Sequence, residues 1–152
     1  HHILIVDDER INRRVAGRFS TKLGATSAEL ADGDEVLAYI KERHPHLLAP
    51  PTSTTRAGGD GDTPAGADRL DAILMDIQME RTRGDEVVAM LRGMGLRIPV
   101  IACTGNAGAH DVARYREAGF TSVLTKPFSL ADVAGVLVQA VSVHHLANGT
   151  RG

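Results

Sequence analysis

The chain has 152 residues and a formal net charge of −2, with 43% hydrophobic and 24% charged residues. This length and composition are typical of one globular domain with a buried core. The near-neutral charge gives no support for binding to nucleic acid or to an anionic membrane, and no apolar run is long enough to span a bilayer. The single cysteine, Cys103, cannot form an internal disulfide, which favours a reducing, cytoplasmic location.

Short apolar runs alternate with segments of helical periodicity in the first third of the chain. The expected elements are a strand at 3–6, a helix at 11–23, a strand at 26–30 and a helix at 35–43. One side of the first helix carries an apolar residue at every fourth position, which predicts that this side is buried. Its members are Ile11, Val15, Phe19 and Leu23. Gly24 ends this helix, because glycine readily adopts the left-handed backbone of a helix C-terminus.

The alternation is interrupted between residues 44 and 69. This segment is rich in proline, glycine, threonine and alanine and shows little apolar periodicity. Because a segment of this composition buries too little apolar surface to form a packed element, we predict an inserted loop at about 44–69. The domain is expected to span 1–143 around this loop, with 144–152 as a flexible tail.

Strand and helix patterns resume after the loop. The expected elements are a strand at 72–75, a helix at 84–92, a strand at 98–102, a helix at 109–118, a strand at 121–125 and a helix at 130–141. Strand–helix alternation repeated five times predicts an α/β fold, in which helices cover both faces of a parallel sheet and make three layers. Right-handed crossovers place every strand-to-helix loop at the carboxyl edge of the sheet, where such folds bind ligands.

Acidic, hydroxyl and amino side chains follow four of the expected strands. They are Asp7, Asp8 and Glu9 after the first strand, Asp76 after the third, Thr104 after the fourth and Lys126 after the fifth. Carboxylates packed together repel one another unless a cation joins them, and oxygen ligands of this kind suit Mg²⁺. A carboxylate can also attack phosphorus, with a metal, a lysine and a hydroxyl group stabilising the transferred oxygens. These residues therefore predict Mg²⁺-dependent phosphoryl transfer to a carboxylate.

Four segments resemble the signature blocks of response-regulator receiver domains, and they occur in the order found in that family. They are Ile5-Val6-Asp7-Asp8-Glu9, Leu74-Met75-Asp76-Ile77-Gln78-Met79, Ala102-Cys103-Thr104-Gly105-Asn106 and Leu124-Thr125-Lys126-Pro127-Phe128. The resemblance covers the chain except for the insertion and the tail. It implies a five-stranded flavodoxin-like sheet of strand order 2-1-3-4-5. It also implies a signalling domain that phosphorylates and dephosphorylates itself, rather than an enzyme acting on a metabolite.

The resemblance implies a role for each matching position. Asp76 is the implied phosphoacceptor, and Thr104 and Lys126 contact the phosphoryl oxygens. The implied Mg²⁺ ligands are Asp8, Asp76 and the backbone carbonyl of Gln78, with Asp7 acting through water. The implied phosphodonor is the phosphohistidine of a histidine kinase or a histidine phosphotransfer protein. An output partner is expected on the face formed by the fourth helix, the fifth strand and the fifth helix.

Several positions carry information about the subfamily. Asn12 resembles receivers attached to hybrid histidine kinases. Val123 stands where receivers often carry an aromatic switch residue, and Glu80 stands where the family usually has proline after the phosphoacceptor block. The loop at 44–69 is unusually long for the family. These departures concern how the signal is transmitted and which partner is chosen, because the acidic set itself is complete.

Three other functions fit a sheet of this kind. A haloacid-dehalogenase-like phosphatase needs a second aspartate two residues after its nucleophile, but Arg10 and Gln78 occupy the positions two after Asp8 and Asp76. A flavodoxin-like binding module needs a phosphate-cradling loop after the first strand, and that loop is acidic here. A receiver that is not phosphorylated and serves only as a docking surface stays an alternative, because the sequence departs from the family pattern at Glu80 and Val123.

Overall fold

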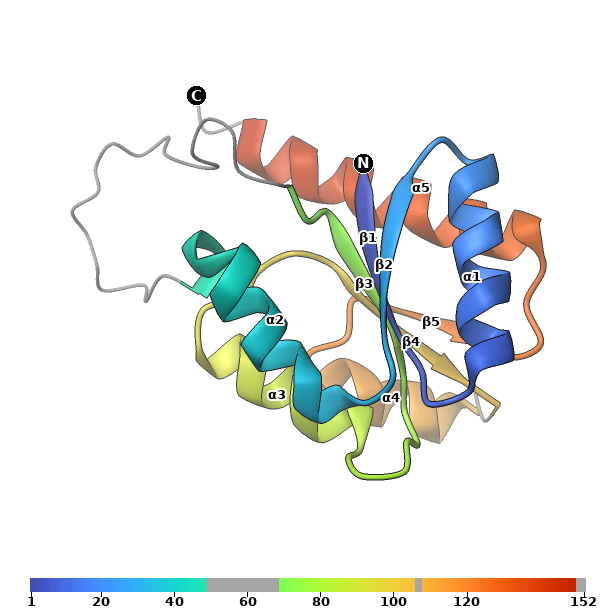
Figure 1. Cartoon of the computed structure of the whole chain (residues 1–152), viewed down its shortest axis with the longest axis horizontal. Coiled ribbons are helices and arrows are strands. Elements are labelled where there is room, and N and C mark those ends of the chain that lie inside the picture. Colours follow the sequence, from blue (N-terminus) through green and yellow to red (C-terminus); the bar gives the residue numbers. More distant parts are fainter. Residues whose placement is uncertain (49–68, 106–107, 150–152) are drawn as a thin grey trace.

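The computed structural model describes residues 1–48, 69–105 and 108–149 (Figure 1). Its centre is a five-stranded parallel sheet of order β2-β1-β3-β4-β5, which confirms the predicted fold class and strand order. The strands are β1 His2–Val6, β2 Thr26–Leu30, β3 Ala72–Asp76, β4 Val100–Thr104 and β5 Ser122–Thr125. The fourth strand begins later than the apolar run at 98–102 predicts, because Pro99 precedes it and has no N–H group to donate to a neighbouring strand.

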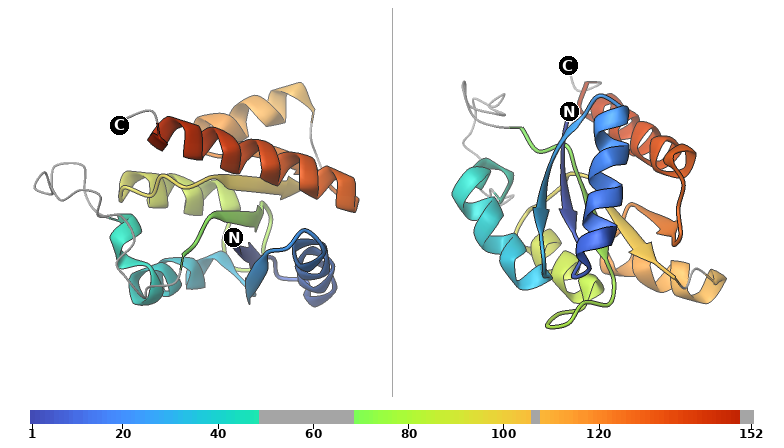
Figure 2. Two further views of the ribbon diagram at one scale, coloured as in Figure 1. Left: turned by 90° about the horizontal axis from the view of Figure 1, so that it is seen from above. Right: turned by 45° about the vertical axis from the view of Figure 1, so that its right-hand side comes forward.

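Helices cover both faces of the sheet, so the three predicted layers are present (Figures 1 and 2). The helices are α1 Arg10–Lys22, α2 Val36–Arg43, α3 Gly84–Gly93, α4 Ala109–Ala118 and α5 Leu130–Gly149. One hydrophobic core joins α2, α3 and α4 to the sheet, and a second joins α1 and α5 to its other face. Successive residues of the inner strands point into alternate cores. The central strands β3 and β4 are therefore buried throughout, which explains their continuous apolar sequences.

The buried side of α1 differs from the predicted one. Ile11 is 75% exposed, and Val15 is 37% exposed, whereas Ala16 and Ser20 are buried against the sheet. Small side chains at these two positions let the helix axis approach the strands closely. The hydroxyl of Ser20 donates a hydrogen bond to the carbonyl oxygen of Ala16, so a polar residue is tolerated on the buried side. Of the predicted apolar residues, Phe19 does pack against the second core, so counting large apolar residues misplaced the buried side by about one position.

The last helix is longer than its apolar pattern predicts. The sequence places its end near residue 141, but α5 continues to Gly149, so the predicted end of the helix was wrong. No proline or glycine lies between Val136 and Asn148, and nothing interrupts the backbone hydrogen bonds before the Asn148-Gly149 pair. Residues 150–152 lie outside the described residues, and the predicted division into domain and tail is otherwise untested.

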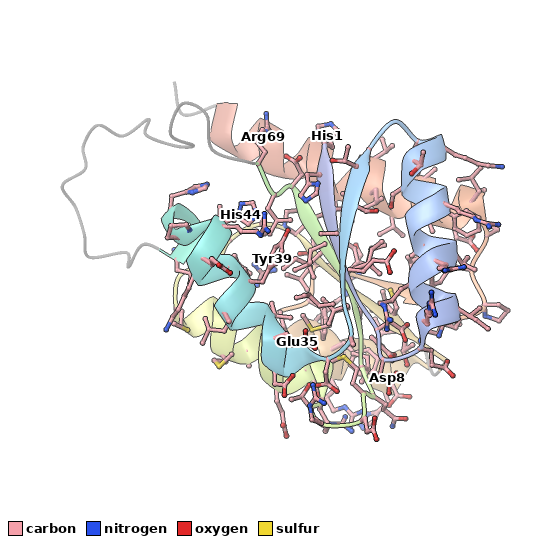
Figure 3. All side chains as sticks on the ribbon, viewed as in Figure 1. His1, Asp8, Glu35, Tyr39, His44 and Arg69 are labelled. Atoms are coloured by element: carbon pink, nitrogen blue, oxygen red, sulfur yellow. The ribbon has the colours of Figure 1, made fainter. Side chains whose placement is uncertain are left out.

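The inserted loop was expected at 44–69, of which 49–68 lie outside the described residues. Before this gap, Pro45–Leu48 form a short 3₁₀ helix after α2, and Arg69 resumes the chain close to the start of β3. Figure 3 shows Arg69 and His1 at one edge of the sheet and Asp8 at the opposite edge. Within the described ranges, no helix is long and apolar enough to cross a membrane.

Candidate functional site

The residues that were singled out from the sequence meet at the carboxyl edge of the sheet. Residues that end or follow four strands, together with the loop after β3, line an open cleft of about 420 Å³ there. Its lining residues are Asp8, Glu9, Asp76, Gln78, Thr104, Gly105 and Lys126. Asp7 lies beneath it and is buried. All seven predicted positions are thus brought to one place, while their individual chemical roles stay predictions.

Lys126 ties together two carboxylates from different strands. Its Nζ atom lies 3.1 Å from Oδ2 of Asp7 and 3.1 Å from Oδ1 of Asp76. The backbone brings the lysine there, because its N–H donates to the carbonyl oxygen of Thr104 at 2.8 Å and so extends the pairing of β4 with β5. From this position the amino group of Lys126 could form a charge-assisted hydrogen bond with an anion bound at either carboxylate.

The electrostatics of the cleft act most strongly on Asp76. Burial raises the pKa of its carboxyl group, the charge of Asp7 raises it further, and the two together outweigh Lys126, so the pKa reaches about 6. Burial by itself would lower the pKa of Lys126, but the carboxylates of Asp7 and Asp76 more than offset this effect and raise it. Asp76 is therefore a carboxylate whose negative charge lacks full compensation within the protein.

This raised pKa has a consequence for stability. The folded protein binds a proton at Asp76 more tightly than the unfolded chain does, so the unfolding free energy falls as pH rises from about 4 through about 6. We expect Asp76→Asn to remove this component. Urea unfolding of the metal-free proteins should show the variant gaining on the order of 1 kcal/mol relative to wild type between pH 4.5 and pH 7. A difference between the two proteins that does not change with pH would contradict the assigned pKa.

Three carboxylates form a cluster suited to a cation. One oxygen each from Asp7, Asp8 and Asp76 lies within 4.8 Å of the other two. Hard oxygen ligands at this spacing, open on one side to solvent, fit a small divalent cation that keeps some of its waters. The raised pKa of Asp76 points the same way, because a bound cation would neutralise the charge that burial and Asp7 make unfavourable. The donor set therefore fits Mg²⁺.

The first turn of α1 holds Asp7 in place. The backbone N–H of Glu9 donates to Oδ1 of Asp7 at 2.9 Å, and a guanidinium nitrogen of Arg13 donates to the backbone carbonyl of Asp7 at 2.7 Å. Asn12 donates to the carboxylate of Glu9 at 2.9 Å and approaches Asp7 at 3.5 Å. The sequence analysis predicted neither the hydrogen bond of Arg13 to Asp7 nor that of Asn12 to Glu9. Asn12 and Arg13 lie about one helical turn after Asp7 and Asp8, and this spacing could have predicted their contacts.

The loop after β3 is a tight hairpin. Gln78 bridges to Arg83, and the N–H of Met79 donates to the carbonyl oxygen of Thr82 at 3.2 Å. Gly84 closes the loop, since its N–H donates to Ile77 at 2.7 Å and a Cβ atom at Gly84 would collide with the backbone carbonyl of Asp76. The loop is thus fully formed with Glu80 where the family usually has proline.

Two further residues near the cleft have structural explanations. Cys103 is buried beside the site, and burial raises the pKa of its thiol to about 12, so it stays protonated and unreactive. Val123 on β5 is partly buried and packs against the core shared with α4. Both residues therefore serve in packing.

A family model for the response regulator receiver domain matches residues 53–138, more than half of the chain. The chain belongs to this family. The receiver domain is 25% identical over 138 residues to Transcription factor SKN7 of Saccharomyces cerevisiae, which covers 91% of this chain and 18% of that protein. It is 30% identical over 128 residues to Sensor histidine kinase RcsC of Escherichia coli, which covers 84% of this chain and 11% of the kinase. The receiver domain thus spans a fifth or less of these relatives.

Solved structures of receiver domains share its fold. The Vibrio cholerae chemotaxis protein CheY4 superposes with a TM-score of 0.69 at 21% identity, over 91% of this chain and 97% of that one. The receiver domain of sensor histidine kinase PA1611 from Pseudomonas aeruginosa gives a TM-score of 0.69 at 26% identity, over 93% and 97% of the two chains. That structure holds a magnesium ion in its active site cleft. The present chain is accordingly a receiver domain of two-component signalling.

Proposed function

We propose that this receiver domain accepts a phosphoryl group on Asp76 from a phosphohistidine in a Mg²⁺-dependent reaction. The observation that carries the proposal is the meeting of three carboxylates, whose oxygens lie within 4.8 Å of one another, with an amino group 3.1 Å from two of them. The magnesium ion in the related receiver of PA1611 supports the choice of metal. Asp8, Asp76 and the carbonyl of Gln78 would hold the ion, and Asp7 would bind it through water.

The proposed step is an in-line displacement at phosphorus. An oxygen of Asp76 forms a bond to phosphorus while the bond from phosphorus to the histidine nitrogen breaks, and the electron pair of that bond returns to the imidazole. Bound Mg²⁺ would supply positive charge to the phosphoryl oxygens. Lys126 is placed to pair with one of these oxygens, and the hydroxyl group of Thr104 to donate a hydrogen bond to another.

The partners and setting are parts of the same proposal. Similarity to the sensor histidine kinase RcsC supports a histidine kinase or a histidine phosphotransfer protein as the donor. We place the output surface on α4, β5 and α5, because Thr104 and Lys126 stand at the start of the connections that lead to these elements. A cytoplasmic location and the absence of activity towards a metabolite belong to this proposal as well.

The other functions receive less support from the cleft. Gln78 lines it where a dehalogenase-type phosphatase requires an acid, and an amide cannot serve as a general acid. A docking-only receiver would have no need of the cluster of Asp7, Asp8 and Asp76, which carries an electrostatic cost in the absence of a cation.

Phosphorylation can be tested on the isolated chain. Incubation with a small phosphodonor such as acetyl phosphate should add the mass of one phosphoryl group in the presence of Mg²⁺ and none in the presence of EDTA. Intact-mass spectrometry reads out this difference directly. A chain that gains no mass at any Mg²⁺ concentration, although it is folded, would favour the docking-only alternative.

The inserted loop should be dispensable for this reaction. It follows α2 in the sequence and precedes β3, and its described flank Arg69 lies at the end of the sheet opposite Asp8 and the cleft (Figure 3). Changes in loop length there cost little free energy. We therefore expect replacement of residues 49–68 by a shorter Gly/Ser linker to change the phosphorylation rate less than about twofold. A well-folded variant with a much slower rate would show that the loop contributes to the site.

A further inference from the structure

We propose that Asp32 is a positioning residue for the metal site, because it fixes the loop after β3 that carries Gln78 into the cleft. This inference rests on the proposed function and adds a residue that lies outside the signature blocks. Asp32 follows β2, on the turn that leads to α2, and it does not line the cleft. It acts through the loop and not on the phosphoryl group.

Both carboxylate oxygens of Asp32 are used by the same loop. The backbone N–H of Arg81 donates to Oδ2 at 2.9 Å, and the hydroxyl group of Thr82 donates to Oδ1 at 2.7 Å. Asp32 is only 2% exposed, and a buried carboxylate is costly unless hydrogen bonds satisfy it. Burial alone would raise the pKa of Asp32, but hydrogen bonds from Thr82 and from the backbone of Arg81 outweigh it, together with those from the backbone of Asp34 and Gly33 in its own turn, and lower the pKa. The carboxylate is therefore held charged by donors of the loop after β3 and of its own turn.

The turn beside Asp32 is shaped to receive the loop. A Cβ atom at Gly33 would lie 2.6 Å from the hydroxyl oxygen of Thr82 and 2.8 Å from a methyl carbon of Val87. Only a residue without a side chain permits this approach. Two segments that are about 50 residues apart in the sequence are thus in direct contact at Asp32 and Gly33.

The loop has few other hydrogen-bonded attachments, although the side chain of Met79 packs against the core shared with α2, α3 and α4. Its remaining backbone hydrogen bonds run within the hairpin or to the start of α3, as in the bond from Met79 to Thr82. In the described part of the chain, the bond from Arg81 to Asp32 is the one that joins the backbone of 79–83 to a distant element. The side chain of Arg81 also pairs with Asp34 at 2.8 Å, but this pair is exposed and contributes little.

Loss of Asp32 should therefore release the loop and remove the pre-positioned carbonyl of Gln78. Residues that orient a metal ligand typically change metal affinity by about 10–100-fold when replaced. We expect Asp32→Ala to weaken Mg²⁺ binding by about 10-fold. At saturating Mg²⁺ the phosphorylation rate should return close to that of wild type, because Asp32 touches neither the phosphoryl group nor the metal. Asp32→Asn keeps one acceptor oxygen and should fall between wild type and Asp32→Ala.

The matched control is Asp71→Asn. Asp71 is also a buried aspartate that accepts a backbone hydrogen bond, from the N–H of His2 at 2.7 Å, but it lies at the opposite edge of the sheet. Its replacement should lower stability and leave Mg²⁺ affinity unchanged. Arg81→Ala removes the exposed ion pairs, retains the backbone N–H and should also bind Mg²⁺ as wild type does.

Calorimetric Mg²⁺ titration of these proteins decides the question. Equal affinities for Asp32→Ala and Asp71→Asn would overturn the role of Asp32. If Asp32→Ala fails to fold, Thr82→Val removes the 2.7 Å bond alone and should still weaken Mg²⁺ binding; unchanged affinity in that variant would also overturn the proposal. A wild-type protein that binds Mg²⁺ but takes no phosphoryl group contradicts the proposed function alone, since the affinities still measure the effect of Asp32.

Discussion

Asp76→Asn should reduce the incorporation of acid-labile phosphate to background. An amide is a poor nucleophile towards phosphorus, and it removes one of the three charges that attract the metal. Labelling by acetyl phosphate in Mg²⁺, followed by intact-mass spectrometry with and without hydroxylamine, measures this loss. Asp71→Asn is the control, because it replaces a buried aspartate outside the cleft and should be labelled as wild type is.

The loss in Asp76→Asn should occur without unfolding. The carboxyl group of Asp76 has its pKa raised to about 6 by burial and by Asp7, so neutralising it relieves an unfavourable charge at pH 7. Far-ultraviolet circular dichroism and urea unfolding should show a fold at least as stable as that of wild type. Labelling that persists undiminished in this folded variant would mean that another residue accepts the phosphoryl group.

Asp8→Ala should weaken Mg²⁺ binding by more than about 100-fold, because it deletes a carboxylate of the three-acid cluster that we propose as a direct ligand. Glu9→Ala is the matched control. Glu9 also lines the cleft, but it lies outside the three-carboxylate cluster and its side chain accepts a hydrogen bond from Asn12. It should lose far less affinity. Calorimetric titration compares the two variants, and similar affinities would show that the ligands are wrongly assigned.

Much of the site could be predicted from the sequence because its parts are local. Asp7, Asp76, Thr104 and Lys126 each end or directly follow an apolar strand, and parallel topology alone brings strand ends together. No contact between distant residues had to be foreseen. The family resemblance then supplied the strand order, which alternation of strands and helices does not determine.

The parts that could not be predicted depend on packing between distant segments. The buried side of α1 is set by the small residues Ala16 and Ser20, and a count of large apolar residues does not detect them. The contact between Asp32 and Thr82 joins positions 50 residues apart, and each looks like an ordinary turn residue by itself. The hairpin that includes Glu80 likewise depends on the distant residue Asp32, which accepts the N–H of Arg81, so Glu80 by itself does not predict its shape.

The cleft and the inserted loop lie at opposite ends of the strands, and this separation bears on how the domain can evolve. The side chains that line the cleft lie at the ends of the strands or on the connections that leave them, and Asp8 marks that end of the sheet in Figure 3. In the described part of the chain, the connections that enter the strands contribute no residue to the lining of the cleft. The segment between Leu48 and Arg69 can thus drift in length and composition, or receive a grafted module, under weak selection. Changes at one end of the molecule can therefore leave the proposed reaction at the other end undisturbed.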